Sequence, residues 1–96
     1  MKQDALITDN RDIILEIAKK YGAQSIRVFG SHARGANHDD SDLDLLVTLE
    51  PNRTLLDLIA IKQDLEDILK CHVDVVTEAS LSSYVRDQIL SEAVAL

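Results

Sequence analysis

Two aspartates placed two residues apart, Asp42 and Asp44, are the strongest candidates for chemistry in this 96-residue chain. They flank the start of an apolar run, LDLLV, that is typical of a strand. Side chains alternate between the two faces of a strand, so both carboxylates are expected on one face. Carboxylate pairs on a rigid strand suit Mg²⁺, which proteins bind through one or two carboxylates plus substrate phosphates. The pair therefore indicates a metal site for a phosphorylated substrate.

A second candidate feature is Gly30-Ser31, which ends the preceding apolar run. Glycine permits close approach of a ligand to the backbone, and Ser31 adds a hydroxyl beside the N–H groups that open the next turn. Such N–H groups form an anion site suited to phosphate. Arg34 could reach a triphosphate as a bidentate donor, and a solvated arginine is the alternative. A phosphate cradle, a short spacer and paired acids together suggest phosphoryl or nucleotidyl transfer.

The glycine, the serine and the two aspartates together resemble the signature of a known family. Gly30-Ser31, ten residues and then Asp42-x-Asp44 resemble the G-S-x10-D-x-D signature of the polymerase-β-type nucleotidyltransferases. In particular the chain resembles their minimal stand-alone members, the MNT antitoxins encoded beside HEPN toxins. That family has a third acid on a neighbouring strand, and Asp74 in HVDVV matches it. The resemblance covers nearly the whole chain and implies catalytic and metal-binding roles for Asp42, Asp44 and Asp74.

The resemblance also implies a mechanism, in which two Mg²⁺ ions about 4 Å apart serve in-line transfer of AMP from ATP. Asp42 and Asp44 would share the ions, and Asp74 would complete the second ion and help to deprotonate the acceptor hydroxyl. Ser31 and nearby N–H groups, beginning with Gly30, would hold the phosphates while pyrophosphate leaves. The implied acceptor is a tyrosine of a HEPN ribonuclease toxin, and adenine specificity comes from the family alone.

Other motif readings fail on particular residues. A calcium loop starting at Asp40 would need glycine at its sixth position and glutamate at its twelfth, where Leu45 and Pro51 stand. A Walker-type loop fails because Ala36 replaces its lysine. Ser31 has no evident base that would make it a covalent nucleophile.

Composition and charge exclude several classes. A hydrophobic content of 46% is typical of a soluble globular protein, and the net charge of −7 argues against unaided binding of nucleic acid. The single cysteine, Cys71, excludes an intramolecular disulfide and favours a reducing cytoplasm. His32 and His38 could be taken for transition-metal ligands, but no Cys or His stands at ligand spacing from them in the sequence. No apolar run has the length of a membrane span, and no signal peptide is recognisable.

The predicted fold class is α/β (α+β), a polymerase-β-type core with a small mixed sheet of three or four strands flanked by helices. Residues 1–96 are expected to form a single minimal nucleotidyltransferase domain. The periodicity predicts a loose leader followed by alternating helices and strands. The expected elements are a leader at 1–8, helices at 9–21, 54–70 and 82–92, and strands at 24–29, 42–47 and 73–76.

Three details complete these expectations. The first helix is expected to start at Asp9 or Asn10, with Asp9 as its cap. The last helix, capped by Ser80 or Ser82, is expected to turn apolar side chains and its tyrosine inward. Residues 94–96 could continue that helix or form an edge strand. The inward set is Leu81, Tyr84, Val85, Ile89 and Leu90.

The acceptor is the open question at this stage. A chain of 96 residues has no room for an acceptor-binding domain, so a second protein should bring the hydroxyl. The expected docking surface is the rim formed by residues 34–40 and the last helix around Arg86. Two competing functions stay open: an antitoxin that neutralises its partner by binding without chemistry, and a dimeric small-molecule nucleotidyltransferase.

Overall fold

A four-stranded mixed sheet forms the centre of the protein, in a computed structural model that describes residues 5–35 and 42–96. The strand order is β3-β2-β1-β4, with β1 antiparallel to both β2 and β4, and β2 parallel to β3. The predicted mixed sheet is confirmed, and the C-terminal residues form its edge strand. The strands are β1 (Ala23–Phe29), β2 (Leu43–Leu49), β3 (Val73–Thr77) and β4 (Val94–Ala95).

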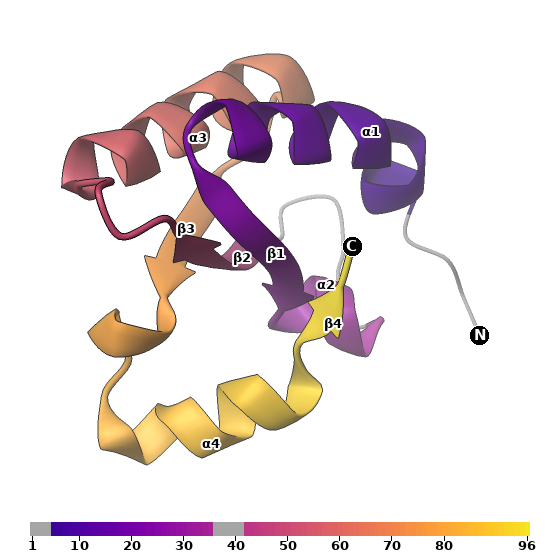
Figure 1. Cartoon of the computed structure of the whole chain (residues 1–96). Helices are drawn as coiled ribbons and strands as arrows, with labels where there is room; N and C mark the ends of the chain where they lie inside the picture. Colours follow the sequence, from indigo (N-terminus) through magenta and orange to yellow (C-terminus); the bar gives the residue numbers. More distant parts are fainter. Residues whose placement is uncertain (1–4, 36–41) are drawn as a thin grey trace.

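Two long helices, α1 and α3, cover one face of this sheet (Figure 1). Their apolar stripes pack on the alternate strand residues that face them, and aliphatic side chains build this core. No helix within residues 5–35 and 42–96 is both long and apolar enough to cross a membrane. The helices are α1 (Ala5–Lys20), α2 (Ser31–Arg34), α3 (Leu55–Leu69), the 3-10 turn η1 (Glu78–Ser80) and α4 (Ser83–Glu92).

The start of the first helix was predicted wrongly. Helix α1 already includes Ala5, so Asp9 lies inside it and does not cap it. Leu6 and Ile7 pack against the core, which supplies the stabilisation that the polar stretch after them lacks. The predicted C-terminal end is close to the observed one, with Lys19 and Lys20 in the last turn, where they suit the helix dipole.

Helix α3 was predicted correctly at both ends because its end signals are local. The Thr54 hydroxyl accepts from the Leu56 N–H, and the Asp57 carboxylate accepts from the Thr54 N–H, a capping box. The helix ends at Leu69, and the cap residue after it, Lys70, takes the left-handed conformation with φ 58°. It connects the parallel strands β2 and β3, as expected for a crossover of this length.

Helix α4 begins after the predicted cap Ser82 and ends at Glu92. Its predicted packing is wrong for Tyr84 and Val85, which are exposed, while Ile89 and Leu90 are half-buried. None of its ten residues, all in the described part of the chain, is buried, and Tyr84 is 95% exposed. The helix lies on the side of the sheet opposite α1 and α3 (Figure 1). Its apolar residues recur at helical spacing, but spacing does not reveal whether a surface is present to receive them.

Candidate active site

Two of the three predicted acids lie side by side on the sheet. Asp44 of β2 is the register partner of Asp74 on β3 and of Phe29 on β1. Register partners point to the same face, so these three side chains form a row across the sheet on the face away from α1 and α3. Asp42 lies just before β2 and is exposed. Parallel pairing of β2 with β3 thus brings together acids that are thirty residues apart in sequence.

The surroundings of Asp44 disfavour its negative charge. Partial burial, the nearby charges of Asp74 and Asp42, and a hydrogen bond with the Asp74 side chain raise the pKa of Asp44 from 3.8 to about 6. His32, buried at 8% exposure, acts in the opposite direction. Repulsion among close carboxylates is relieved by a proton or a cation, so this position favours binding of a positive charge.

Gly30 forms the sharp turn between β1 and α2. Its φ of 74° is unfavourable for any residue other than glycine. A Cβ added at this position would also overlap Asp44 Oδ2. The Gly30 carbonyl accepts from the Ala33 and Arg34 N–H groups, at 3.1 Å each, and Ser31 is the first residue of α2. The predicted phosphate cradle therefore lies directly against the predicted metal ligand.

Arg34 lies in α2, close to this turn, and contacts a residue that the sequence did not suggest. Its Nη1 donates to both carboxylate oxygens of Glu92 at 3.1 and 3.2 Å, and the Gly30 N–H donates to Glu92 Oε1 at 3.0 Å. Glu92 is sixty-two residues from Gly30, and no local pattern links the two.

Lys62 and Glu66 of α3 hold the start of β3, and sequence reasoning missed them as well. The Val73 N–H donates to Glu66 Oε2 at 3.0 Å, and Lys62 Nζ donates to the Val73 carbonyl at 2.7 Å. The two side chains also pair with each other at 3.0 Å. Val73 precedes Asp74, so this contact fixes the backbone that carries the third acid.

Within residues 5–35 and 42–96, no three His, Cys, Asp or Glu side chains are gathered closely enough to form a complete metal site. The fit for a cation therefore depends on the Asp44–Asp74 pair and the chemistry of its oxygens. Residues 36–41, which include His38, Asp40 and part of the expected docking rim, lie outside the described residues.

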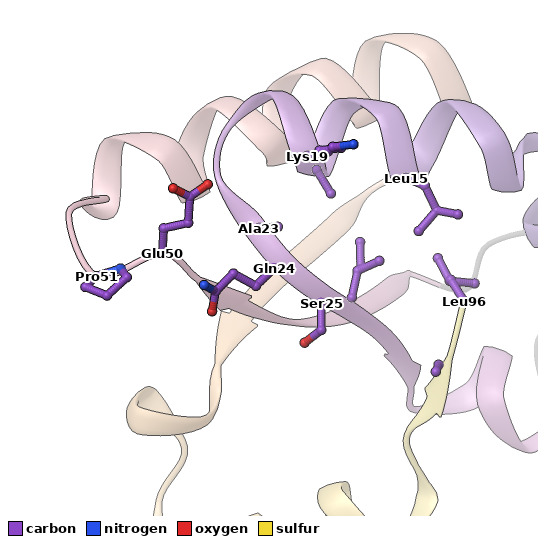
Figure 2. Close-up of a pocket in the computed structure, with 11 residues that line it drawn as sticks. Leu15, Lys19, Ala23, Gln24, Ser25, Glu50, Pro51 and Leu96 are labelled. Atoms are coloured by element: carbon purple, nitrogen blue, oxygen red, sulfur yellow. The ribbon is translucent and has the colours of Figure 1, made fainter.

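The described surface also holds an open groove of about 730 Å³ between α1 and the outer part of β1. Leu15, Lys19, Gln24 and Leu96 are among its lining residues (Figure 2). Its lining includes Glu50 at the far end of β2 and none of the three acids, so the groove is separate from the candidate site.

Comparison with known proteins agrees with this geometry. A family model described as a nucleotidyltransferase domain matches residues 11–96. The protein adenylyltransferase MntA of Thermococcus cleftensis is 39% identical over 79 residues, which cover 82% of this chain and 80% of the relative.

Solved structures show the same fold. One, described as a candidate minimal nucleotidyltransferase, is 46% identical with a TM-score of 0.84, and the match covers 94% of this chain and 92% of that one. A toxin–antitoxin structure with AMP-PNP is 25% identical with a TM-score of 0.77, and the match covers 90% of this chain and 71% of that one. The chain therefore belongs to the nucleotidyltransferase domain family, and it is similar to protein adenylyltransferases and to a minimal nucleotidyltransferase.

Proposed function

We propose that this protein transfers AMP from ATP to a tyrosine hydroxyl of a HEPN ribonuclease toxin and thereby acts as its antitoxin. The observation that carries the proposal is the contact of Gly30 with Asp44, which in turn is paired with Asp74. In this proposal Gly30-Ser31 is the phosphate cradle, Asp44 is the metal ligand and Asp74 is the acid for the acceptor, and the closeness of these residues on one sheet face supports it.

The residues present fit Mg²⁺. Asp44 and Asp74 supply hard carboxylate oxygens, and burial together with the charges of Asp74 and Asp42 raises the pKa of Asp44, so a bound cation would be stabilised there. Asp42, exposed just before β2, lies near enough for its charge to help raise the pKa of Asp44, and we propose it as a further ligand. Bound Mg²⁺, two ions in the family pattern, would neutralise the triphosphate and lower the pKa of the acceptor hydroxyl.

In the proposed step, the tyrosine oxygen attacks the α-phosphorus of ATP. The new O–P bond forms as the bond from the α-phosphorus to the bridging oxygen breaks, and pyrophosphate leaves with that oxygen. The hydroxyl proton passes to Asp74. Ser31 at the start of α2 holds the β- and γ-phosphates, whereas the Gly30 N–H is engaged by Glu92, so the protein contributes mainly positioning and charge neutralisation.

The acceptor protein is proposed from three considerations. The described residues form a single sheet core without an added acceptor-binding unit. The AMP-PNP structure with a similar fold is a toxin–antitoxin complex. The net charge of −7 favours a basic partner, such as a protein that cleaves RNA. Separately, the single cysteine, Cys71, favours a location in the cytoplasm. We place the docking surface on the side of α4 around Arg86, which is exposed.

The direct test uses purified protein, its co-encoded toxin and ATP labelled in one phosphate. Label at the α-phosphate should appear on the toxin, whereas label at the γ-phosphate should not, because pyrophosphate leaves. Asp44→Asn should abolish the labelling, and an exposed acid on α3, Asp67, provides the matched Asp67→Asn control. Transfer of γ-label would indicate a kinase, and absence of both labels with tight binding would favour the non-catalytic antitoxin.

A further inference from the structure

The carboxylate of Glu92, the last residue of α4, accepts hydrogen bonds from both Gly30 and Arg34. We call these three residues the clasp. Glu92 Oε1 accepts from the Gly30 N–H at 3.0 Å and from Arg34 Nη1 at 3.2 Å, and Oε2 accepts from the same Nη1 at 3.1 Å. The Glu92 side chain is 18% exposed, whereas that of Arg34 is 52% exposed. The largely buried Glu92 carboxylate thus accepts hydrogen bonds from two donors close to Ser31, the Gly30 N–H and Arg34 Nη1.

The clasp matters because α4 has little else to hold it. None of its residues is buried in the described structure. After Glu92, β4 pairs with β1 through Arg27 and Val28, and the Leu96 N–H donates to the Ile26 carbonyl at 3.2 Å. The C-terminal end of α4 is therefore fixed to the body by the edge strand and by the clasp beside it.

The clasp also constrains the candidate phosphate cradle. Gly30 has a positive φ and lies directly against Asp44, so a change in its orientation would disturb both Ser31 and the acid. A free Glu92 carboxylate at this position would repel a triphosphate. Its pairing with Arg34 offsets that charge and leaves the Ser31 side of the turn able to accept phosphate.

We propose that Arg34 and Glu92 are positioning residues for nucleotidyl transfer, which hold the Gly30–Ser31 turn in its phosphate-binding shape and tie α4 to it. This inference rests on the proposed function. It assigns Arg34 an action through Glu92 in place of the direct contact with the triphosphate that the sequence suggested.

A double-mutant cycle separates these two roles of Arg34. We expect Arg34→Ala and Glu92→Ala each to weaken binding of a non-hydrolysable ATP analogue with Mg²⁺ by about tenfold, and the double variant to be no weaker than either single one. If Arg34 contacts the triphosphate and Glu92 competes for it, Glu92→Ala would bind the analogue more tightly than the wild type. That result, or additive losses, would overturn the proposal.

A conservative variant and a matched control exclude a general loss of stability. Glu92→Gln keeps an oxygen that can accept from Gly30 and should recover part of the lost affinity. Glu78→Ala removes an acid of the 3-10 turn η1, whose Oε2 lies 4.0 Å from Arg27 Nη2 and which is not part of the clasp. It should leave analogue affinity within about twofold of the wild type, as expected for a partly exposed ion pair. An equal loss in Glu78→Ala would contradict a role specific to the clasp.

Hydrogen exchange tests the clasp independently of ATP. Glu92→Ala should speed exchange at the Gly30 and Leu96 amides, because the first loses its acceptor and the second belongs to the C-terminal segment that follows the released helix end. Unchanged exchange at both amides would overturn the clasp itself. If Glu92→Ala exchanges faster but the wild-type protein does not bind the ATP analogue, the proposed function is refuted and the clasp is still supported.

Discussion

The carboxyl group of Asp44 has its pKa raised to about 6, first by burial and then by the charges of Asp74 and Asp42. Between about pH 4 and pH 6 the folded chain therefore binds more protons at this position than the unfolded chain does. The free energy of unfolding of the metal-free protein should fall as pH rises through that window. The shift corresponds to at most about 3 kcal/mol, and solvent screening around this half-exposed group reduces it to about 1 kcal/mol.

Asp44→Asn should remove this pH dependence and stabilise the metal-free protein at neutral pH by about 1 kcal/mol, while abolishing transfer. Urea unfolding in the presence of a chelator, at pH 5 and pH 7, measures both effects, with Asp67→Asn as the control. A clear loss of stability in Asp44→Asn would assign Asp44 a structural role.

Ser31→Ala should weaken binding of an ATP analogue by about ten- to a hundredfold, because one hydrogen bond to a charged phosphate is lost. Binding of divalent metal at the acids should not change. Calorimetric titration measures both, and Ser25→Ala, at the exposed far end of β1, serves as the control. Wild-type affinity in Ser31→Ala would remove Ser31 from the site.

Among the elements, β3 depends on a helix for its position. Glu66 accepts from the Val73 N–H and from Lys62, and these contacts, led by the backbone hydrogen bond, lower the pKa of Glu66 below 4.5. A carboxyl whose pKa is lowered by folding stabilises the protein above its ordinary pKa and loses that contribution as pH falls. The contact should therefore hold β3, and Asp74 with it, at neutral pH and release it in acid.

Glu66→Gln should make the protein less stable than the wild type at neutral pH, and the difference should shrink as pH falls below about 4.5. Turnover should also fall, because Asp74 loses its fixed backbone. Thermal unfolding across the acid range tests this, with Glu16→Gln on the exposed side of α1 as the control. A stability difference that is constant with pH would contradict the role of the Glu66 charge.

The helices and strands that were predicted correctly are those whose signals lie close together in the sequence. The Thr54 capping box and the apolar periodicity after it lie within a few residues of each other, and α3 was placed correctly. The pairing of Asp44 with Asp74 follows from a crossover between parallel strands, and the family pattern had indicated the third acid on a neighbouring strand. The start of α1 was misjudged because its first residues are stabilised by tertiary contacts with the core.

The long-range contacts could not be read from the sequence. Glu92 reaches Gly30 across sixty-two residues, and no periodicity or motif marks that pair. The exposure of α4 was missed for a related reason: residues such as Tyr84 and Val85 have the spacing of a buried face, yet they remain on the surface. Hydrophobic spacing predicts a helix, but the packing of the whole molecule determines whether another surface covers that helix.

At the scale of the whole molecule, we propose that the toxin binds α4, which lies on the side of the sheet opposite α1 and α3 (Figure 1). Asp42→Asn should bind the toxin as the wild type does, with an association rate that falls as salt rises, because the chain carries a net charge of −7. It should nevertheless fail to protect growth at matched expression. Full protection by Asp42→Asn would favour an antitoxin that acts by binding alone.

The central claim is that this protein modifies its partner covalently, and the most direct measurement is the intact mass of the co-expressed toxin. With the wild-type protein, the toxin should gain the mass of one or more AMP units, located on a tyrosine by peptide fragmentation. With Asp44→Asn, the toxin should co-purify without added mass. An unmodified toxin that is bound and silenced by the wild-type protein would contradict the account.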